Sequence, residues 1–72
     1  MTRAEHLQWA KDRAMEYLEK GNLMEAYQSF RSDMNKHDEL KGHVGHLLGD
    51  QLLLAGKLNS TDAMKAHIDG FR

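Results

Sequence analysis

The apolar residues of this chain recur at the spacing of an α-helix, and no stretch alternates with the period of a β-strand. One apolar face lies between residues 3 and 20, and a second lies between residues 23 and 36. Residues 39–55 are apolar around most of the helical circumference, and a short fourth pattern covers residues 61–69. We therefore predict an all-α fold: one compact four-helix domain, residues 1–72, built from two antiparallel helical hairpins.

Residues that cap helices lie at the expected boundaries. Thr2 and Glu5 form the T-x-x-E pattern of a capping box, and Gly21 can take the left-handed conformation that commonly ends a helix. Asn22 follows at once and is expected to cap the second helix across a tight turn. Asp38 is expected to cap the third helix, and a further group of capping residues precedes the fourth.

The third pattern, residues 39–55, is so apolar that we predict it to be the central helix, covered by the others on more than one side. Gln51 lies in the middle of its apolar face, where the amide needs a partner such as Tyr17 or Tyr27. The residues that make this face are Leu40, Val44, Leu47, Leu48, Leu54 and Ala55.

Three glycines, Gly42, Gly45 and Gly49, lie together on the neighbouring side of this predicted helix. Glycine allows another helix to approach closely. We predict a close-packing role for them, with the first or the last helix of the same chain in the groove. The alternative is a homodimer seam, in which a second copy fills it.

The polar residues of the predicted central helix form one narrow stripe: Glu39, His43, His46 and Asp50. On an ideal helix all four lie within about 60° of one another. Two imidazoles flanked by carboxylates could bind zinc or a similar ion. The alternative is an ordinary solvated face, which the absence of the H-E-x-x-H pattern favours.

Three side chains are the candidates for contact with a protein partner. Trp9 lies opposite the apolar face of the first helix, among charged residues, and tryptophan and arginine are enriched at binding hot spots. The alternative for Trp9 is burial beneath the last helix, against Phe71. Met24 and Arg31 fall off the inner face of the second helix and complete the predicted partner-binding set.

Composition removes several classes of function. Ten basic and eleven acidic residues are spread evenly, which argues against nucleic acid as the main partner. No apolar run reaches the roughly 20 residues of a membrane span. The chain has no cysteine, no phosphate-binding glycine loop and no nucleophile pattern. A small-molecule pocket of ~300 Å³ or more is not expected in so short a chain. We therefore expect a non-enzymatic, cytoplasmic protein without a cofactor.

Residues 10–34 resemble part of a tetratricopeptide repeat, with matches at Ala14, Tyr17, Gly21, Ala26 and Phe30. Asp33 stands where that family has a small residue. Two hairpins are fewer than the three or so that such stacks need, so the resemblance implies an apolar flank open to a partner.

A second set of segments extends over nearly the whole chain. It includes Thr2-Arg3-Ala4-Glu5-His6-Leu7, Trp9-Ala10-Lys11, Arg13-Ala14-Met15-Glu16-Tyr17-Leu18, Ser32-Asp33-Met34, Gly42-His43 and Ile68-Asp69-Gly70-Phe71. These segments resemble a family of short helical proteins encoded by phages and prophages of actinobacteria. The resemblance implies a phage-encoded protein in the cytoplasm of the bacterial host and transfers no catalytic residue.

These patterns predict a small protein-interaction module of phage type that binds and modulates a host or phage protein. The alternative is a structural or accessory component that assembles into a homo-oligomer. A histidine-based metal-binding protein is the third interpretation.

Overall fold

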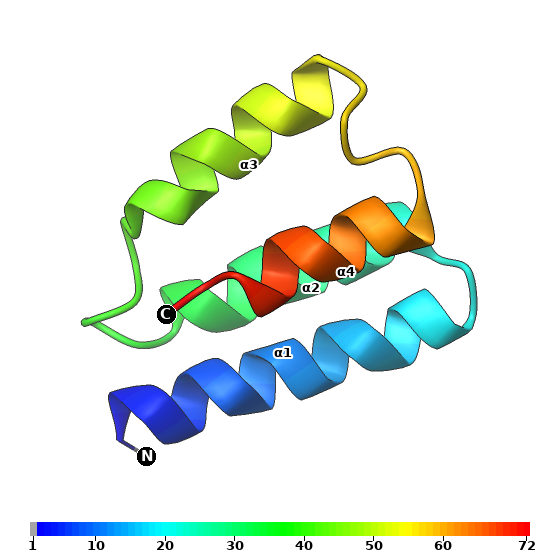
Figure 1. The fold of residues 1–72 in the computed structure, drawn as a ribbon. Coiled ribbons are helices and arrows are strands. Elements are labelled where there is room, and N and C mark those ends of the chain that lie inside the picture. The colour runs from blue at the N-terminus through cyan, green and yellow to red at the C-terminus, as the bar shows by residue number, and fades with distance from the viewer. Residues whose placement is uncertain (1) are drawn as a thin grey trace.

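The structure, a computed structural model, describes residues 2–72, with the backbone alone at Val44. Its four helices are α1 (Arg3–Glu19), α2 (Leu23–Asn35), α3 (Val44–Leu54) and α4 (Thr61–Asp69) (Figure 1). Residues 2–72 contain no strand. The predicted all-α fold of four helices is confirmed.

The first hairpin forms as its capping residues predict. The Glu5 amide donates to Thr2 Oγ1 and the Thr2 amide donates to Glu5 Oε1, both at 3.1 Å, so the capping box is complete. Gly21, at φ +76°, turns the chain into α2. Asn22 occupies the N-cap position of α2 as expected, although its side chain makes no capping hydrogen bond.

Helices α1, α2 and α4 pack on one another and enclose the core. In α1 and α2 the predicted apolar faces point inward, although Tyr17 and Leu23 are only partly buried. α4 begins as expected, because Ser60 Oγ accepts from the Ala63 amide at 3.1 Å. The buried apolar residues of the core are Leu7, Ala10, Ala14, Leu18, Ala26, Tyr27, Phe30, Met34, Leu40, Leu58, Met64, Ile68 and Phe71.

The third helix is shorter than predicted, because residues 39–42 form turns, His43 is the N-cap residue and α3 begins at Val44. Leu40 is fully buried, which holds the chain against the core just after α2. Gly42 then takes φ +74°, a left-handed conformation outside the helical region that few residues other than glycine adopt. Asp38 therefore does not cap this helix: the cap is His43, whose Nδ1 accepts from the Gly45 amide at 2.9 Å.

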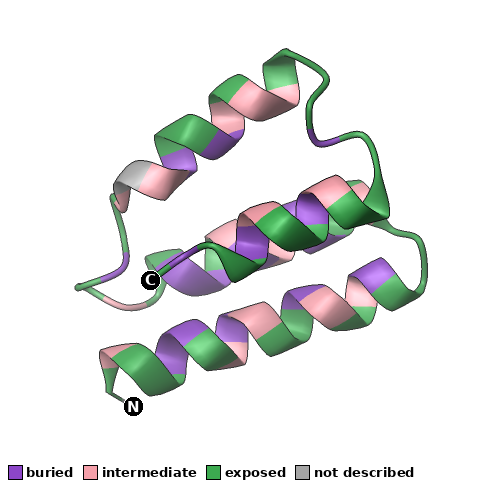
Figure 2. Ribbon diagram, in the orientation of Figure 1, coloured by how far each residue is buried: buried purple, intermediate pink, exposed green. Residues whose placement is uncertain are grey.

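The prediction that this helix is central is wrong. α3 runs opposite to α4 but stands apart from the three-helix core, so the second hairpin is splayed open (Figure 1). Its outward residues are exposed (Figure 2), including Gln51, which needs no buried partner. The predicted contribution of the Val44 side chain lies outside the described part of the structure.

Candidate interaction surface around the third helix

The described side chains of α3 divide sharply between two faces. Gly45, His46, Gly49 and Asp50 face the core and are buried or partly buried, as are Leu52 and Leu53. The other face, which we call the outward stripe, consists of five exposed residues at the spacing i, i+1, i+4, i+7, i+8. They are Leu47, Leu48, Gln51, Leu54 and Ala55, the last being the C-cap residue.

The outward stripe exposes large apolar side chains. Leu47 is 65% exposed, Leu48 53% and Leu54 90%. Sequence periodicity identified these residues as one apolar face but not the direction in which that face points. The helix turns its small and polar side to the core and its leucines to solvent.

The inward side of α3 rests on aromatic and imidazole rings. A Cβ added to Gly45 would lie 2.7 Å from the Phe71 ring, and one added to Gly49 would lie 2.6 Å from His67 Nε2. Side chains from α4 and the C-terminal segment thus occupy the space that these two glycines leave. Gly42 belongs to the turn before α3 and has nothing within 4 Å of such a Cβ, so its predicted place in the glycine groove is wrong.

A polar link joins α3 to α2. The Tyr27 hydroxyl donates to Asp50 Oδ1 at 2.6 Å, and the Arg31 guanidinium forms an ion pair with the same oxygen. The hydrogen bond from Tyr27, with the charge of Arg31, lowers the pKa of the Asp50 carboxyl. Burial and the Asp50 hydrogen bond raise the pKa of Tyr27 to about 12, so the phenol stays protonated as a donor.

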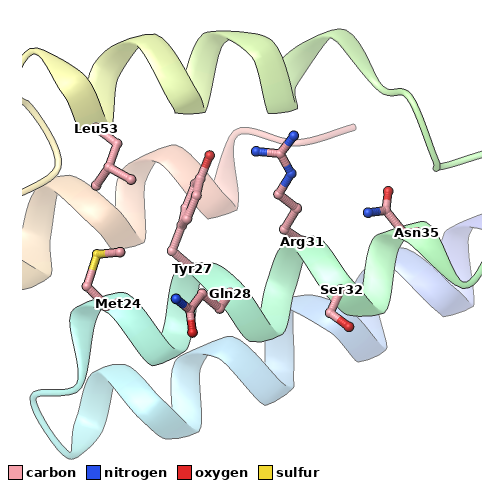
Figure 3. Close-up of a pocket in the computed structure, with 7 residues that line it drawn as sticks. All are labelled: Met24, Tyr27, Gln28, Arg31, Ser32, Asn35 and Leu53. Atoms are coloured by element: carbon pink, nitrogen blue, oxygen red, sulfur yellow. The ribbon is translucent and has the colours of Figure 1, made fainter.

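Beside this link lies an open groove of about 510 Å³ between α2 and α3 (Figure 3). Met24 and Leu53 supply its apolar end, and Arg31 stands at its polar end with its head toward α3. The sequence predicts little room for a pocket of ~300 Å³ or more, but the splayed position of α3 leaves an open groove of that size on the surface. The remaining lining residues are Tyr27, Gln28, Ser32 and Asn35.

The structure brings two of the three predicted contact residues together. Met24 is 49% exposed and lines the groove with Arg31, although Arg31 is also committed to Asp50. Trp9 lies elsewhere, half-buried, with its ring 5.1 Å from His6 and with Arg13 stacked over it at 5.1 Å. The alternative for Trp9, burial beneath the last helix against Phe71, is wrong, because its ring is only half-buried and lies among His6, Arg13 and Lys36. Its role in partner binding stays a prediction.

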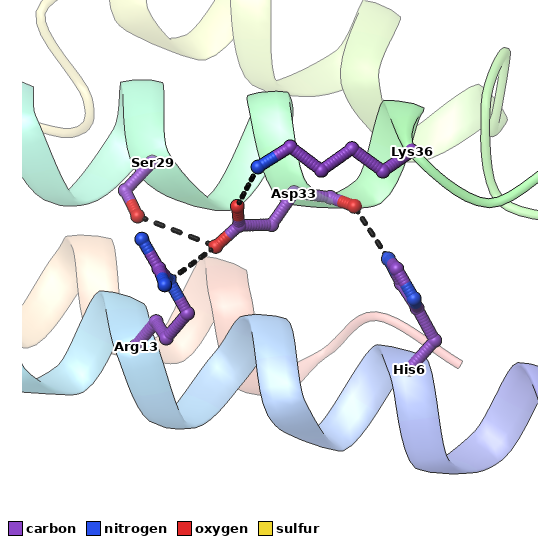
Figure 4. A network of polar contacts seen from close by, with 5 residues as sticks. All are labelled: His6, Arg13, Ser29, Asp33 and Lys36. Atoms are coloured by element: carbon purple, nitrogen blue, oxygen red, sulfur yellow. Dashed lines mark hydrogen bonds and ion pairs between the residues drawn. The ribbon is translucent and has the colours of Figure 1, made fainter. Parts of the chain in front are cut away.

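A buried carboxylate, Asp33, connects α2 to α1 (Figure 4). Asp33 is only 2% exposed, and its oxygens accept from Arg13 Nε at 2.8 Å and from Lys36 Nζ at 3.1 Å. The Ser29 hydroxyl lies 3.5 Å away, and a His6 ring nitrogen contacts the Asp33 carbonyl oxygen. The same position that departs from the tetratricopeptide pattern therefore holds a carboxylate that is paired with Arg13 and Lys36 and links the two helices.

The predicted polar stripe does not exist as one helical face, because Glu39 and His43 precede α3. Within residues 2–72, no three His, Cys, Asp or Glu side chains converge in a way that could hold a metal ion. Asp50 is engaged by Tyr27 and Arg31, and His46 is buried, 5.4 Å from the Phe71 ring.

Three histidines surround the Phe71 ring instead: His43, His46 and His67, with centroids 5.0–5.4 Å from it. Burial lowers the pKa of both His46 and His67, and the charges of Arg31 and His43 lower that of His46 further. The Nε2 atoms of His46 and His67 are buried without a hydrogen-bond partner. The imidazoles of His46 and His67 therefore pack as neutral groups between α3 and α4.

The chain matches no protein-family model, no curated protein and no solved structure. None of the helices described in residues 2–72 has the length and apolar character needed to cross a membrane.

Proposed function

We propose that this chain is a small, non-enzymatic protein-interaction module of the phage-encoded type. It acts in the cytoplasm of a bacterial host, where it binds a host or phage protein through α3. The observation that carries the proposal is the outward stripe: Leu47, Leu48 and Leu54 are more than half exposed on one face of one helix. Contiguous apolar surface of this kind marks interaction sites in folded proteins.

The energetics favour the same interpretation. Burial of a leucine side chain is worth about 1.5–3 kcal/mol, so three exposed leucines forgo a large stabilisation in the isolated chain. A partner that covers the outward stripe recovers it. An amphipathic helix that places residues at i, i+4 and i+7 in an apolar groove is a recurring mode of protein recognition. The groove lined by Met24 and Arg31 offers a second contact on the other side of α3.

The test is affinity capture from host lysate with the tagged chain as bait. Leu54→Glu should weaken capture about 10- to 100-fold, the equivalent of one buried leucine at 1.5–3 kcal/mol. Ala4→Glu adds the same charge to an exposed position of α1 and should leave capture unchanged.

Two further variants locate the contact. If the groove takes part in binding, Met24→Glu should weaken capture. If Trp9 on α1 takes part, Trp9→Ala should weaken it. A bound protein that is retained equally by wild type and Leu54→Glu would contradict the assignment of the outward stripe.

A further inference from the structure

We propose that three histidines form an acid-sensitive latch, which releases α3 on protonation while α1, α2 and α4 stay packed. This histidine latch consists of His43, His46 and His67, which surround the Phe71 ring at centroid distances of 5.0–5.4 Å. Imidazole is the side chain whose charge changes between about pH 5 and 8, so a fall in pH over that range is the trigger. The latch controls the position of α3 whatever covers the outward stripe, and it therefore goes beyond partner binding.

His43 holds the first turn of α3 through a contact that only its neutral form can make. Its Nδ1 accepts from the Gly45 amide at 2.9 Å, and its Nε2 lies 3.2 Å from the Arg72 carbonyl oxygen. A carbonyl oxygen can only accept, so Nε2 carries the proton and Nδ1 is the acceptor of a neutral imidazole. Protonation places a hydrogen on Nδ1, which removes the N-cap and adds a positive charge at the positive end of the helix dipole. Acid therefore acts directly on the start of α3.

His46 and His67 oppose protonation because they are buried. The Nε2 atoms of both rings have no hydrogen-bond partner, so a protonated ring would bury a charged N–H group that nothing accepts. Burial accordingly holds the pKa of both histidines below the ordinary value. Release of α3 opens this seam to water and removes the cost. Each of these histidines then favours release by up to about tenfold for every pH unit below 6.5, until its folded-state pKa is reached.

The charges that face His46 from α2 and α3 do not offset this cost. Arg31 on α2 presents a positive charge, and the His43 ring lies 6.3 Å from the His46 ring, so two protonated rings would repel each other. The carboxylate that acts on His46 is Asp50, which is already engaged by the Tyr27 hydroxyl and by the Arg31 guanidinium.

The side chains of α1 that reach this seam are also cationic. Lys11 donates to the carbonyl oxygens of Asp69 and Phe71, and Arg3 donates to the carbonyl oxygen of Arg72. On α4, the Asp69 side chain is exposed. Protonation therefore adds positive charge to a seam that is already bordered by cations on α1 and α2.

The seam between α1 and α2 tolerates protonation better. His6 is buried there, but one of its ring nitrogens contacts the Asp33 carbonyl oxygen, so this nitrogen already donates a proton. A doubly protonated imidazole keeps that hydrogen bond, whereas His43 loses the acceptor on which α3 depends. The contacts of α3 are thus expected to break before those between α1 and α2.

Nuclear Overhauser effects to the Phe71 ring test the release, because this ring touches both sides of the seam. A Cβ added to Gly45 of α3 would lie 2.7 Å from the ring, and Phe30 of α2 packs edge-to-face on it at 4.7 Å. Between about pH 7.5 and about pH 5, the cross-peak between Gly45 and Phe71 should fall roughly tenfold, whereas that between Phe30 and Phe71 should persist. Retention of both contacts at the lower pH overturns the latch. Loss of both at the same pH overturns the independent release of α3.

Two matched variants test whether the titrating group lies in the latch. His43 and His37 each accept, through Nδ1, from the amide two residues later, and asparagine can do the same without titrating. His43→Asn should therefore lower the pH midpoint of release, whereas His37→Asn, outside the latch, should leave it unchanged. An equal shift in the two variants, or a shift in neither, overturns the role of His43.

Removal of all three rings completes the test. In the triple variant His43→Asn, His46→Leu, His67→Leu, the contact between Gly45 and Phe71 should persist at about pH 5. Loss of that contact at the same pH as in wild type overturns the latch. If the triple variant does not fold at neutral pH, the comparison of His43→Asn with His37→Asn still decides.

Discussion

Replacement of Gly49 by alanine measures how tightly α3 is seated. Two effects oppose each other at this position. Alanine stabilises a helix interior by about 1 kcal/mol relative to glycine. Overpacking costs about 1–3 kcal/mol, and the new Cβ would lie 2.6 Å from His67 Nε2 and 3.0 Å from the Tyr27 hydroxyl. Because both neighbours are held, His67 against Phe71 and Tyr27 by Asp50, we expect overpacking to prevail.

The expected net effect is a loss of about 0–2 kcal/mol in the free energy of unfolding, the overpacking cost minus the propensity gain. Urea unfolding followed by circular dichroism measures it, and each kcal/mol corresponds to roughly 4–8 °C in Tm for a domain of this size. His67→Ala provides the control background, since it removes the closest atom. There, Gly49→Ala should be neutral or stabilising by up to about 1 kcal/mol. If Gly49→Ala stabilises the otherwise wild-type protein by about 1 kcal/mol, the close packing of α3 against His67 and Tyr27 is refuted.

Three further perturbations probe the polar groups. Asp33→Ala should lower the free energy of unfolding by about 1.5–3 kcal/mol in urea unfolding, because it removes charge-assisted hydrogen bonds while the half-exposed cations of Arg13 and Lys36 can turn to solvent. Asp12→Ala on the exposed side of α1 should change it by less than about 0.5 kcal/mol. Burial holds the pKa of His46 and of His67 below the ordinary 6.5, so the unfolded chain takes up protons first as the pH falls. The stability that the two neutral histidines contribute should be fully present above pH 6.5 and should decline as the pH drops through that value toward the folded-state pKa. Replacing both histidines by asparagine should flatten the plot of the denaturant midpoint against pH. Tyr27→Phe, which removes one donor to a carboxylate, should cost about 0.5–1.5 kcal/mol in the same assay, and no loss would contradict the link between α2 and α3.

Local rules of sequence specify the first hairpin well. The capping box of Thr2 and Glu5, the left-handed Gly21 and the apolar spacing of α1 and α2 are all properties of neighbouring residues. Such features depend on the chain within one or two turns, so they can be predicted from the sequence.

The place of α3 depends on the whole fold and was not predictable in the same way. Helical periodicity groups Leu47, Leu48 and Leu54 on one face but cannot say whether that face points toward the core. The core was already filled by α1, α2 and α4, with Leu40 from the connecting segment, so these leucines were left outside. Gly42 was the available signal for the helix boundary, since glycine before a capping residue is compatible with a left-handed turn.

The partners of Asp33 also could not be predicted from sequence patterns. Arg13 lies 20 positions away along the chain, and the pair forms only because α1 and α2 run side by side. The position itself was noticeable, because an acid replaced a small residue in a repeat-like stretch.

Because α3 packs beside the three-helix core and not within it, we expect it to open independently of the core. Since α1, α2 and α4 enclose most of the buried apolar residues, a local opening that detaches α3 would leave most of the core closed. We therefore expect the amide protons of its eleven residues to exchange with solvent before those of α2. The helix that carries the exposed leucines would then be the first to separate from the core when a partner binds.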